Sequence, residues 1–313
     1  MKVRIDFCDM GPGLVKTNNF FIRLLKKRFD VELADSPDFV IYFDHNQHMH
    51  RLHNCVRIYV GTEWFLPDWK ECDYALTPNY LDDPRHMRLP FYVPWRDGAG
   101  PLLRQNEDPE QVLAEKTGFC SFVVSTNHPV KNRKRLEFFQ KLSRYKKVDS
   151  GGRFMNNIGG PVAQTWHAKV QFLRSYKFHL AFENESHDGY TTEKIYDAMM
   201  ARTLPIYWGN PRIAEEFNPR SFLSYFDYGS DEALLERVIE LDRDNAKYLN
   251  YAREPYFHAN QPNEFYDPDR LLDFFERIFS TPIQPVAQRR RFFEFNRWIL
   301  ARKNRPRPWQ IPS

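Results

Sequence analysis

Short apolar runs that alternate with amphipathic helical stretches restrict the fold of this chain more than any other feature. In the first third, residues 18–28 place their apolar side chains on one helical face. The strand-like runs around them are residues 3–8, 31–34, 39–43, 56–60 and 74–77. Alternation of this kind is typical of a parallel sheet covered by helices. The pattern therefore predicts an α/β protein.

The alternation stops near residue 93 and begins again near residue 116. The stretch between them is rich in Pro, Gly and acidic or amide residues, as linkers are. Beyond it we expect strands at residues 119–124, 178–182 and 204–208, and helices at 131–145, 166–175, 191–201, 231–243 and 267–279. A chain of 313 residues suits two domains. We expect two Rossmann-like domains facing a central cleft, over residues 1–115 and 116–280, and a tail over 281–313.

The basic charge is concentrated at the C-terminal end. The net charge is +4, but residues 289–313 hold eight basic residues and one acidic residue, which gives this segment +7. The rest of the chain therefore sums to −3. On charge grounds the body is not expected to bind nucleic acid.

The cysteines and the first residues indicate a reducing compartment. Cys8, Cys55, Cys72 and Cys120 form no C-x-x-C pair and have no zinc-like spacing, so we interpret them as reduced core residues. The N-terminal residues resemble a strand rather than a signal peptide, and no run approaches the ~20 apolar residues of a membrane helix. We therefore expect a cytoplasmic protein or a trimmed catalytic domain.

Two facing α/β domains suit either a dehydrogenase or a transferase that holds a nucleotide-linked donor in one domain and an acceptor in the other. The glycines argue against the dehydrogenase. Gly11-Pro12-Gly13 follows a strand but lacks the third glycine of G-x-G-x-x-G. The transferase is the better interpretation.

The loop after the strand ending at Phe182 carries a candidate phosphate site. Thr191 or Thr192 can cap a helix whose first turn holds Glu193 and Lys194. A helix N-terminus at the carboxyl end of a parallel strand offers N–H groups and a positive dipole end to an anion. A lysine is unusual there, and a bound phosphate would explain it, while Glu193 could accept hydrogen bonds from ribose hydroxyls. The alternative is a surface Glu–Lys pair on an ordinary helix.

Residues 182–211, FENESHDGYTTEKIYDAMMARTLPIYWGNP, resemble the signature of the α1,3/4-fucosyltransferases of bacterial type, glycosyltransferase family 10. The shared pattern is Phe-Glu-Asn, then Tyr-x-Thr-Glu-Lys, then Pro-Ile-x-x-Gly, and it extends upstream through residues 156–160 and 169–178. The resemblance implies a GT-B type fold whose C-terminal domain holds GDP-fucose. It implies that Glu193 contacts the ribose and Lys194 the diphosphate, and that Asn184 and Tyr190 line the donor site.

The resembled family also binds the diphosphate through an arginine on the first helix of the donor domain. The local pattern is Arg-x-x-aromatic-x-x-x-Leu after a strand ending in Ser, and Arg135 fits it. Arg133 lies close to this position and remains open as the alternative. A solvated basic helix face is a further interpretation. A guanidinium suits a diphosphate because its fork binds two oxygens at once.

Inverting transfer requires a base that removes a proton from the acceptor hydroxyl. Glu63 lies in the loop just after the strand that ends at Val60. The resemblance implies a catalytic glutamate at this place, ahead of Pro67 and the Asp73-Tyr74-Ala75 motif. We expect Glu63 to be that base, against the alternatives of an exposed loop acid or an acid that caps a turn.

No metal is expected to be required. Asp242-Arg-Asp244 and Asp267-Pro-Asp269 match D-x-D, but both lie at helix ends and are interpreted as structural. Lys194, Arg135 and the helix dipole would neutralise the departing GDP instead. A divalent ion would act at most as a stimulant.

The expected reaction is inverting transfer of L-fucose from GDP-fucose to O3 or O4 of GlcNAc or Glc in an oligosaccharide or lipid-linked glycan, of Lewis-antigen or lipopolysaccharide type. One alternative is an inverting GT-B transferase that uses another nucleotide sugar, and another is a catalytically silent sugar- or nucleotide-binding protein. The residues do not specify the acceptor.

The basic C-terminal tail has its own predicted role. Residues 289–302 can form a helix with Phe292, Phe295, Trp298 and Ile299 on one side, which suggests peripheral contact with the inner membrane face. The alternatives are aromatics packed on the body or a disordered solubilising tail.

Overall fold

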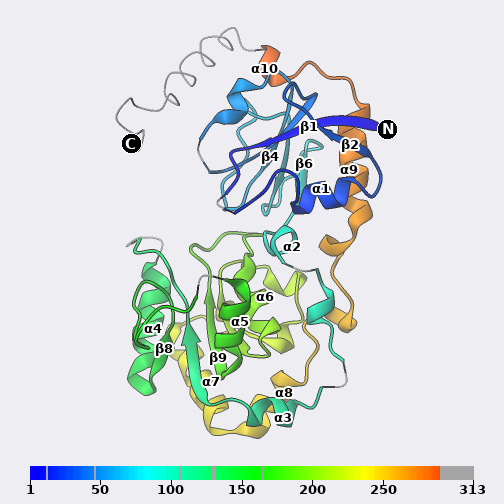
Figure 1. The fold of residues 1–313 in the computed structure, drawn as a ribbon. Coiled ribbons are helices and arrows are strands. Elements are labelled where there is room, and N and C mark those ends of the chain that lie inside the picture. Colours follow the sequence, from blue (N-terminus) through cyan, green and yellow to red (C-terminus); the bar gives the residue numbers. More distant parts are fainter. Residues whose placement is uncertain are drawn as a thin grey trace, which may run out of the picture. The chain divides into compact units, whose positions relative to one another are not determined.

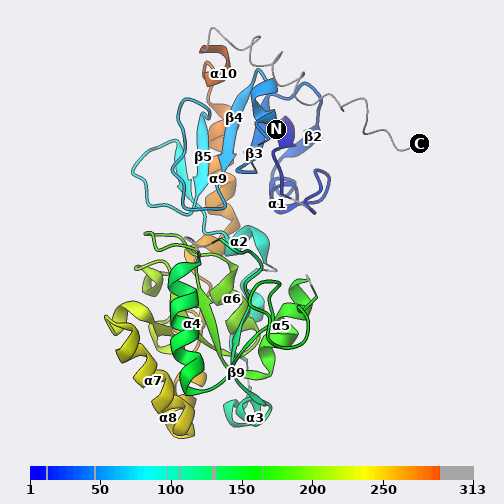
Figure 2. The same ribbon diagram turned by 90° about the vertical axis from the view of Figure 1, so that its left-hand side faces the viewer.

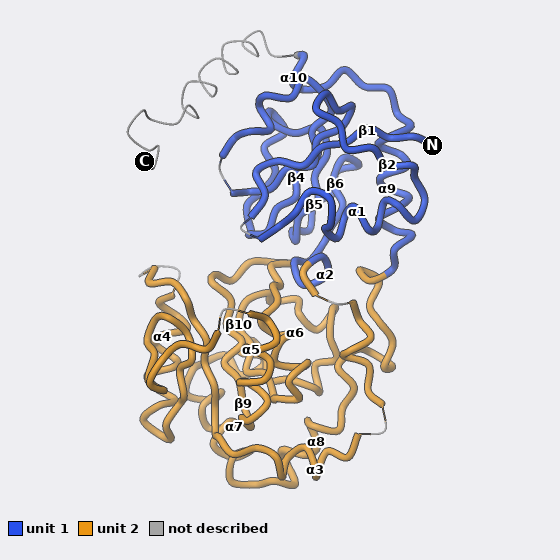
Figure 3. Tube along the Cα trace, in the orientation of Figure 1, with its two compact units in different colours: residues 1–94, 267–313 blue, residues 95–266 orange. Residues whose placement is uncertain are grey.

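A computed structural model describes residues 1–289 except residues 12, 46, 97, 106, 129–131 and 164. The chain forms two compact units, coloured separately in Figure 3. Unit 1 is Met1–Pro94 with Asp267–Ser313, and unit 2 is Trp95–Tyr266. Each unit contains one parallel sheet, so the predicted α/β class is confirmed. In the described part of the chain, no helix has the length and apolar character needed to cross a membrane.

Unit 1 is built on a parallel sheet with the order β2-β1-β3-β4-β5-β6 (Figure 1). Its strands are β1 (Lys2–Cys8), β2 (Asp30–Leu33), β3 (Phe39–Phe43), β4 (Val56–Val60), β5 (Tyr74–Thr77) and β6 (His86–Arg88). Its helices are α1 (Phe20–Leu25), α9 (Pro268–Ser280) and α10 (Val286–Arg289), and α2 (Tyr92–Trp95) ends it before unit 2. Strand β4 is buried along its whole length, as expected of a strand covered on both faces.

Helix α9 belongs to unit 1, although residues 116–280 were expected to form one domain. Its buried side chains are Leu271, Leu272, Phe274, Phe275 and Ile278. Phe275 meets Phe21 of α1 edge to face, with ring centroids 6.2 Å apart. Arg28, just after α1, donates to Asp269 at 2.7 Å and also binds Asp273 and Glu276 on α9. The apolar face was visible in the sequence, but order along the chain does not reveal which unit that face covers.

Unit 2 is built on a parallel sheet with the order β11-β10-β9-β7-β8. Its strands are β7 (Gly118–Phe122), β8 (Val148–Ser150), β9 (Tyr176–Phe182), β10 (Leu204–Trp208) and β11 (Leu223–Ser224). Its helices are α3 (Pro109–Ala114), α4 (Arg133–Tyr145), α5 (Trp166–Arg174), α6 (Glu193–Met200), α7 (Asp231–Arg243) and α8 (Asn245–Ala252). Helix α4 packs on α7 and α5 packs on α6, on opposite faces of the sheet (Figure 2).

Short 3-10 turns complete both units. They are η1 (Met49–Leu52) in unit 1, and η2 (Gly100–Leu102), η3 (Ile213–Glu215), η4 (Pro219–Ser221), η5 (Tyr225–Asp227), η6 (His258–Asn260) and η7 (Glu264–Tyr266) in unit 2.

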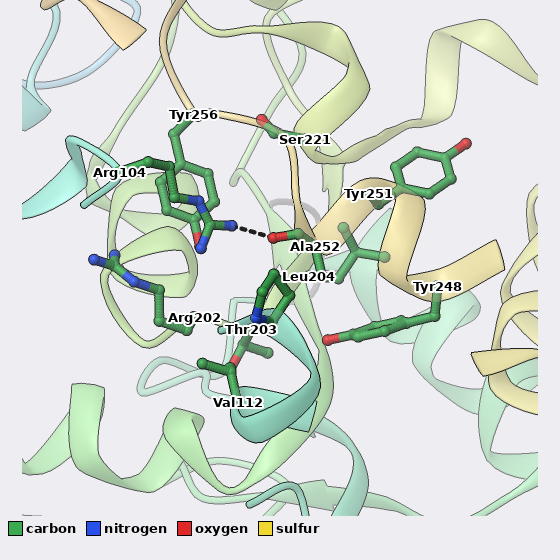
Figure 4. Close-up of a pocket in the computed structure, with 11 residues that line it drawn as sticks. Arg104, Val112, Arg202, Thr203, Leu204, Ser221, Tyr248, Tyr251, Ala252 and Tyr256 are labelled. Carbon is green, nitrogen blue, oxygen red and sulfur yellow. Dashed lines mark hydrogen bonds between the residues drawn. The ribbon is translucent and has the colours of Figure 1, made fainter. Parts of the chain in front are cut away.

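The segment over residues 95–115 belongs to unit 2, although the first domain was expected to extend to residue 115. Arg104 donates to the carbonyl of Ala252 at 2.5 Å, and Arg202 donates to both carboxylate oxygens of Glu107 at 2.6 Å. Figure 4 shows Arg104 and Arg202 beside the ring of Tyr256. The cavity among these side chains is about 20 Å³, room for about one water molecule. Paired charges therefore fasten the segment to unit 2, and the spacing of Pro and Gly did not predict this attachment.

Candidate functional site

The sheet order places the loops after β7 and β9 at the point where the winding of unit 2 reverses. The chain passes from β7 to β8, which lies on one side of β7, and then crosses to β9, which lies on the other side of β7. Open parallel sheets bind ligands outside the carboxyl ends of the two strands that flank such a point. The loop over residues 183–192 lies there, as do residues 123–128 and 132 of the segment that follows β7.

Glu183 anchors the loop after β9. It is fully buried, and its carboxylate accepts from the Thr192 N–H at 2.7 Å, the Thr192 hydroxyl at 2.6 Å and Lys194 Nζ at 2.8 Å. Burial raises the pKa of Glu183, and the charge of Lys194 opposes this rise without cancelling it. A Cβ at position 209 would collide with the Glu183 side chain, so the glycine there is required. An acid directly after the apolar run Leu180–Phe182 was the signal that could have identified this anchor.

Thr192 is the N-cap of α6, but its side chain makes no cap hydrogen bond. Its hydroxyl donates to Glu183 instead, so the expected capping by a threonine hydroxyl is wrong for this helix. The side chain of Thr191 donates elsewhere, to Glu216 at 2.9 Å. Neither threonine hydroxyl therefore occupies the N–H groups at the start of α6.

Lys194 and Glu193 form the charged first turn of α6. Burial lowers the pKa of Lys194, but the carboxylates of Glu183 and Glu193 outweigh it, and the net pKa is raised. Burial likewise works to raise the pKa of Glu193, but Lys194 and Lys169 hold it well below its usual range. Glu193 Oε1 lies 3.9 Å from Lys194 Nζ and 4.0 Å from Lys169 Nζ. The turn therefore presents a fixed cation and an ionised carboxylate that can only accept hydrogen bonds.

Arg135 lies on the first turn of α4 and is 4% exposed. Its Nε donates to Asn132 Oδ1 at 2.9 Å. Its charge lowers the pKa of Lys194, although that effect is smaller than those of burial and the two carboxylates. Arg133, the open alternative, has a side chain that is 80% exposed and lies 3.9 Å from Glu137. Arg135 and Lys194 thus lie on the first turns of two helices, α4 and α6, near enough for the charge of Arg135 to act on Lys194, whereas Arg133 lies on the surface.

Asn184 and Tyr190 occupy the same loop. The Asn184 side chain amide donates to the Tyr190 hydroxyl at 3.5 Å, and Tyr190 is 1% exposed. Gly189 has a φ of 85°, a conformation that glycine adopts without strain, and its N–H donates to Asn210 Oδ1 at 2.8 Å. Tyr190 therefore supports Asn184 from inside the protein.

Asp197 is a second anchor that sequence reasoning missed. It lies one turn after Glu193, is fully buried, and accepts from Arg96 at 2.6 and 3.0 Å. It also accepts from Lys169 Nζ at 2.8 Å and from Trp166 Nε1 at 3.0 Å. An aspartate within the buried helical face Ile195–Met199 was the signal for it. Through Asp197, α6 holds Lys169 near Glu193.

In unit 1, Glu63 lies in the loop after β4 and is half-buried. Asp44, just after β3, accepts from the Thr62 N–H at 2.8 Å, the Thr62 hydroxyl at 2.7 Å and the Glu63 N–H at 3.1 Å. Sequence reasoning did not identify Asp44 as this brace. Asp44, at the end of β3, thus holds the backbone of the loop that carries Glu63. The role of Glu63 as the base stays a prediction.

The D-x-D aspartates lie at helix ends, as expected. Asp244 and Asp267 cap α8 and α9, and Asp242 accepts from Tyr145 and Lys146. Over the residues that the structure describes, no group of three His, Cys, Asp or Glu side chains is placed to hold a metal ion. The four cysteines are free and buried.

Two family profiles match the chain. Residues 113–262 match "Glycosyltransferase family 10 (fucosyltransferase) C-term", and residues 5–95 match "Alpha-(1,3)-fucosyltransferase FucT N-terminal domain". The "Alpha-(1,3)-fucosyltransferase FucT" of Helicobacter pylori is 31% identical over 258 residues, which are 72% of this chain and 50% of the relative. The human "4-galactosyl-N-acetylglucosaminide 3-alpha-L-fucosyltransferase FUT6" is 35% identical over 156 residues, 49% of this chain and 41% of the relative. The chain spans about half the length, or less, of the curated relatives that it matches.

Solved structures resemble the chain over almost its whole length. A crystal structure of an α1,3-fucosyltransferase with GDP has a TM-score of 0.74 and 26% identity, and covers 90% of this chain and 91% of its own. The structure with GDP-fucose has a TM-score of 0.73 and 26% identity, and covers 91% of this chain and 92% of its own.

Proposed function

Since the chain belongs to glycosyltransferase family 10, the fucosyltransferases, we propose that it transfers L-fucose from GDP-fucose to a hydroxyl of an oligosaccharide acceptor. The fold is of the GT-B type, with a Rossmann-like sheet in each unit. The acceptor hydroxyl in this proposal is O3 or O4 of GlcNAc or Glc, and the configuration at the fucose anomeric carbon is inverted.

The observation that carries this proposal is that Arg135 and Lys194 lie on the first turns of α4 and α6, the helices that follow β7 and β9. The charge of Arg135 disfavours the charged form of Lys194, and a diphosphate bound between the two cations would offset that repulsion. An ammonium group has three N–H donors. Lys194 donates one N–H to Glu183 and one to the Thr192 hydroxyl. Among the described residues, its third N–H is left to donate to a phosphate oxygen. Arg135 adds a fork that can bind two oxygens.

Glu193 completes the donor site in this proposal. Its pKa is held low, so it is ionised at neutral pH and accepts hydrogen bonds from the ribose hydroxyls. Asn184, half-buried beside Tyr190, lines the same site. Asp197 accepts a hydrogen bond from Lys169 and so holds that cation near Glu193, which helps to keep Glu193 ionised.

The chemical step is a direct displacement at the fucose anomeric carbon. Glu63 takes the proton of the acceptor hydroxyl as the new C–O bond forms and the bond to GDP breaks. Lys194 and Arg135 stabilise the negative charge that develops on the departing GDP. These residues supply the charge neutralisation without a required metal, and a divalent ion is at most a stimulant.

A nucleotide panel tests the donor identity. Ligands that bind only the folded protein raise its melting temperature. GDP and GDP-fucose are expected to raise it, and UDP-sugars at the same concentration are expected to leave it unchanged. Stabilisation by UDP-sugars and not by GDP would favour the second candidate, an inverting GT-B transferase with another nucleotide sugar. GDP binding without any transfer would favour a catalytically silent binding protein.

A further inference from the structure

Glu183 is a buried acid at the carboxyl end of β9, and the proposed function makes no use of its titration. Its side chain is fully buried, and removing an ionised carboxyl group from water is costly. Burial raises the pKa of Glu183, the charge of Lys194 opposes that rise without cancelling it, and the charge of Glu193 adds to it. Glu183 is therefore closer to taking up a proton than an ordinary glutamate is.

The ammonium group of Lys194 serves two carboxylates. Lys194 Nζ lies 2.8 Å from Glu183 Oε2 and 3.9 Å from Glu193 Oε1. The other donors to Glu183 are neutral, namely the Thr192 N–H at 2.7 Å and the Thr192 hydroxyl at 2.6 Å. The ionised form of Glu183 thus depends on a cation that it shares with a second acid.

The side of Glu183 that faces β10 does not favour its charge. Tyr207 on β10 is fully buried, and burial together with the charge of Glu183 raises the pKa of this phenol well above its usual value. Glu216, a further buried acid, also raises the pKa of Tyr207. This side therefore contributes a neutral hydroxyl group and another carboxyl group.

The charged groups linked to Lys194 nearly balance before a ligand binds. The cations are Lys194, Lys169, Arg135 and Arg96, and the carboxylates are Glu183, Glu193 and Asp197. Four positive and three negative charges leave a net charge of +1. The terminal phosphate of a nucleoside diphosphate carries about −1.5 to −2, and the inner phosphate adds to it. A bound diphosphate therefore makes the net charge of this buried group negative.

Of the three carboxylates, Glu183 is the one placed to respond with a proton. Burial works to raise the pKa of Glu193, but Lys194 and Lys169 hold it well below its usual range. Asp197 accepts from two cationic side chains. Glu183 has only its share of Lys194, and a phosphate bound to Lys194 competes for that share.

The protonated form of Glu183 fits the hydrogen bonds that are already present. Its Oε1 continues to accept from the Thr192 N–H. Its Oε2, once protonated, can donate to Thr192 Oγ1 at the same 2.6 Å, because a hydroxyl oxygen also accepts. Lys194 keeps its bond to Thr192 Oγ1 at 2.8 Å, and the N–H that it gave to Glu183 becomes available to a phosphate oxygen.

We propose that Glu183 takes up a proton from water when a nucleoside diphosphate binds at the start of α6, and returns it to water when the nucleotide leaves. The inference rests on the proposed function for the place of the diphosphate, and it does not depend on the base or the sugar. The proton removes one negative charge beside the phosphates and gives more of Lys194 to them. Binding that takes up a proton weakens as pH rises.

Calorimetry in buffers of different ionisation enthalpy measures the proton uptake of the full chain. GDP and UDP are titrated at about pH 7.5, where a terminal phosphate with a pKa of about 6 is already ionised. Glu183→Gln is the test variant, because a neutral amide of the same size cannot take up the proton. Glu232→Gln removes a 70% exposed carboxylate of α7 and is the matched control.

Wild type and the control are expected to take up about 0.5–1 proton per bound nucleotide, and Glu183→Gln about 0.1 or fewer. The wild-type Kd is then expected to rise about three- to tenfold for each unit above about pH 7, whereas that of Glu183→Gln stays flat. A merely structural role of Glu183 would weaken binding in the variant at every pH and leave the pH dependence in place. That result, or equal proton uptake by wild type and Glu183→Gln, overturns the inference.

Infrared difference spectra of wild type decide the matter if Glu183→Gln does not fold. Added nucleotide is expected to produce the carbonyl band of a protonated carboxyl group, and the band is expected to shift when the glutamates are isotope-labelled. Nucleotide binding without this band overturns the inference.

The two nucleotides separate this inference from the proposed donor. Proton uptake with UDP, and no binding of GDP, would support the inference and contradict the assignment of GDP-fucose. Binding of GDP without proton uptake would overturn the inference and leave that assignment standing.

Discussion

The two units share a sheet topology and differ in the charge that they gather at the same edge. By chain order both sheets begin with the second strand, then the first, then the third. At the carboxyl ends of its strands, unit 2 pairs Lys169 and Lys194 with buried carboxylates and adds Arg135. Unit 1 places Asp9, Asp44, Asp68 and Glu71 around a cavity there, with Arg51 as the one arginine of the lining. Topology thus gathers charged side chains at the same edge of both sheets, and the residue types after each strand decide the balance of charge there.

The largest expected effect separates chemistry in unit 1 from donor binding in unit 2. Glu63→Gln is expected to lower turnover by roughly 10²-fold or more, because an amide of the same size cannot take the proton. GDP affinity, measured by calorimetry, is expected to stay near the wild-type value. Glu32→Gln, an exposed acid of unit 1 paired with Lys2, is the control. Turnover within a few-fold of wild type at saturating substrates would exclude Glu63 as the base.

The next largest effect is expected from the two cations of unit 2, Arg135 and Lys194. Arg135→Ala and Lys194→Ala are each expected to weaken GDP binding by about 1.5–3 kcal/mol, since each removes a charge-assisted contact to the diphosphate. Arg133→Ala is the matched control, because that side chain is exposed, and it is expected to bind GDP as wild type does.

Calorimetry with GDP, on variants whose circular dichroism matches wild type, decides the assignment. Weaker binding in Arg133→Ala and not in Arg135→Ala would reassign the arginine. Unchanged affinity in both Arg135→Ala and Lys194→Ala would remove the proposed donor site.

A smaller effect concerns one buried histidine in each unit. Burial lowers the pKa of His86 in unit 1 to about 4 and that of His179 in unit 2 to about 3. Unfolded histidine titrates near about pH 6.5, so the unfolded chain takes up the protons first as pH falls. The stability that each neutral imidazole contributes is present above pH ~6.5 and is lost towards the folded pKa, by about 2 kcal/mol at pH 5.

Urea unfolding at pH 7 and pH 5 measures this loss. His86→Gln and His179→Gln are each expected to reduce the loss of unfolding free energy between pH 7 and pH 5. Each variant is expected to do so in the unfolding transition of the unit that contains it. Equal pH dependence in wild type and both variants would show that these imidazoles are not the groups responsible.

The smallest effect concerns the basic tail. The tail was expected to begin at residue 281, but Val286 and Ala287 are buried, and the Val286 N–H donates to Asp73 at 2.8 Å. The first part of the expected tail is therefore packed on unit 1, and the rest of the predicted membrane helix, residues 290–302, lies outside the described residues. Truncation after residue 289 is expected to keep activity on a soluble oligosaccharide within a few-fold.

Sedimentation with anionic vesicles tests the membrane role of the removed residues. The full chain is expected to sediment and the truncated chain to remain in the supernatant, because the basic charge is removed. Equal sedimentation of both proteins would contradict the anchor.

The sequence predicted the long central elements of both units and missed the short or polar ones. Strands β3, β4, β5 and β10 lie where the apolar runs predicted them, and so does α7. Strands β6 (His86–Arg88) and β8 (Val148–Ser150) were missed because each has only three residues, two of them polar, and so shows no hydrophobic periodicity. Their end residues are nevertheless buried in the structure.

Sequence reasoning named the candidate ligand-binding residues and missed the residues that support them. Lys194 was named because a lysine is unusual at a helix start, Glu193 because it shares that turn, and Arg135 because it fits the pattern of the resembled family. Glu183, Asp197 and Asp44 were missed because a buried carboxylate is explained only by its partners, which come from other loops. Local motifs therefore identify the groups offered to a ligand, whereas the fold alone reveals the groups that hold them.

The proposed function of this chain depends on GDP-fucose being its donor. The most direct test incubates the full chain with GDP-fucose and N-acetyllactosamine, and analyses the product by mass spectrometry and NMR. We expect a product that has gained one deoxyhexose at O3 or O4 with inverted anomeric configuration, together with one GDP per transfer. A product formed only from another nucleotide sugar, or a fucosylated product with retained configuration, would contradict the proposed function.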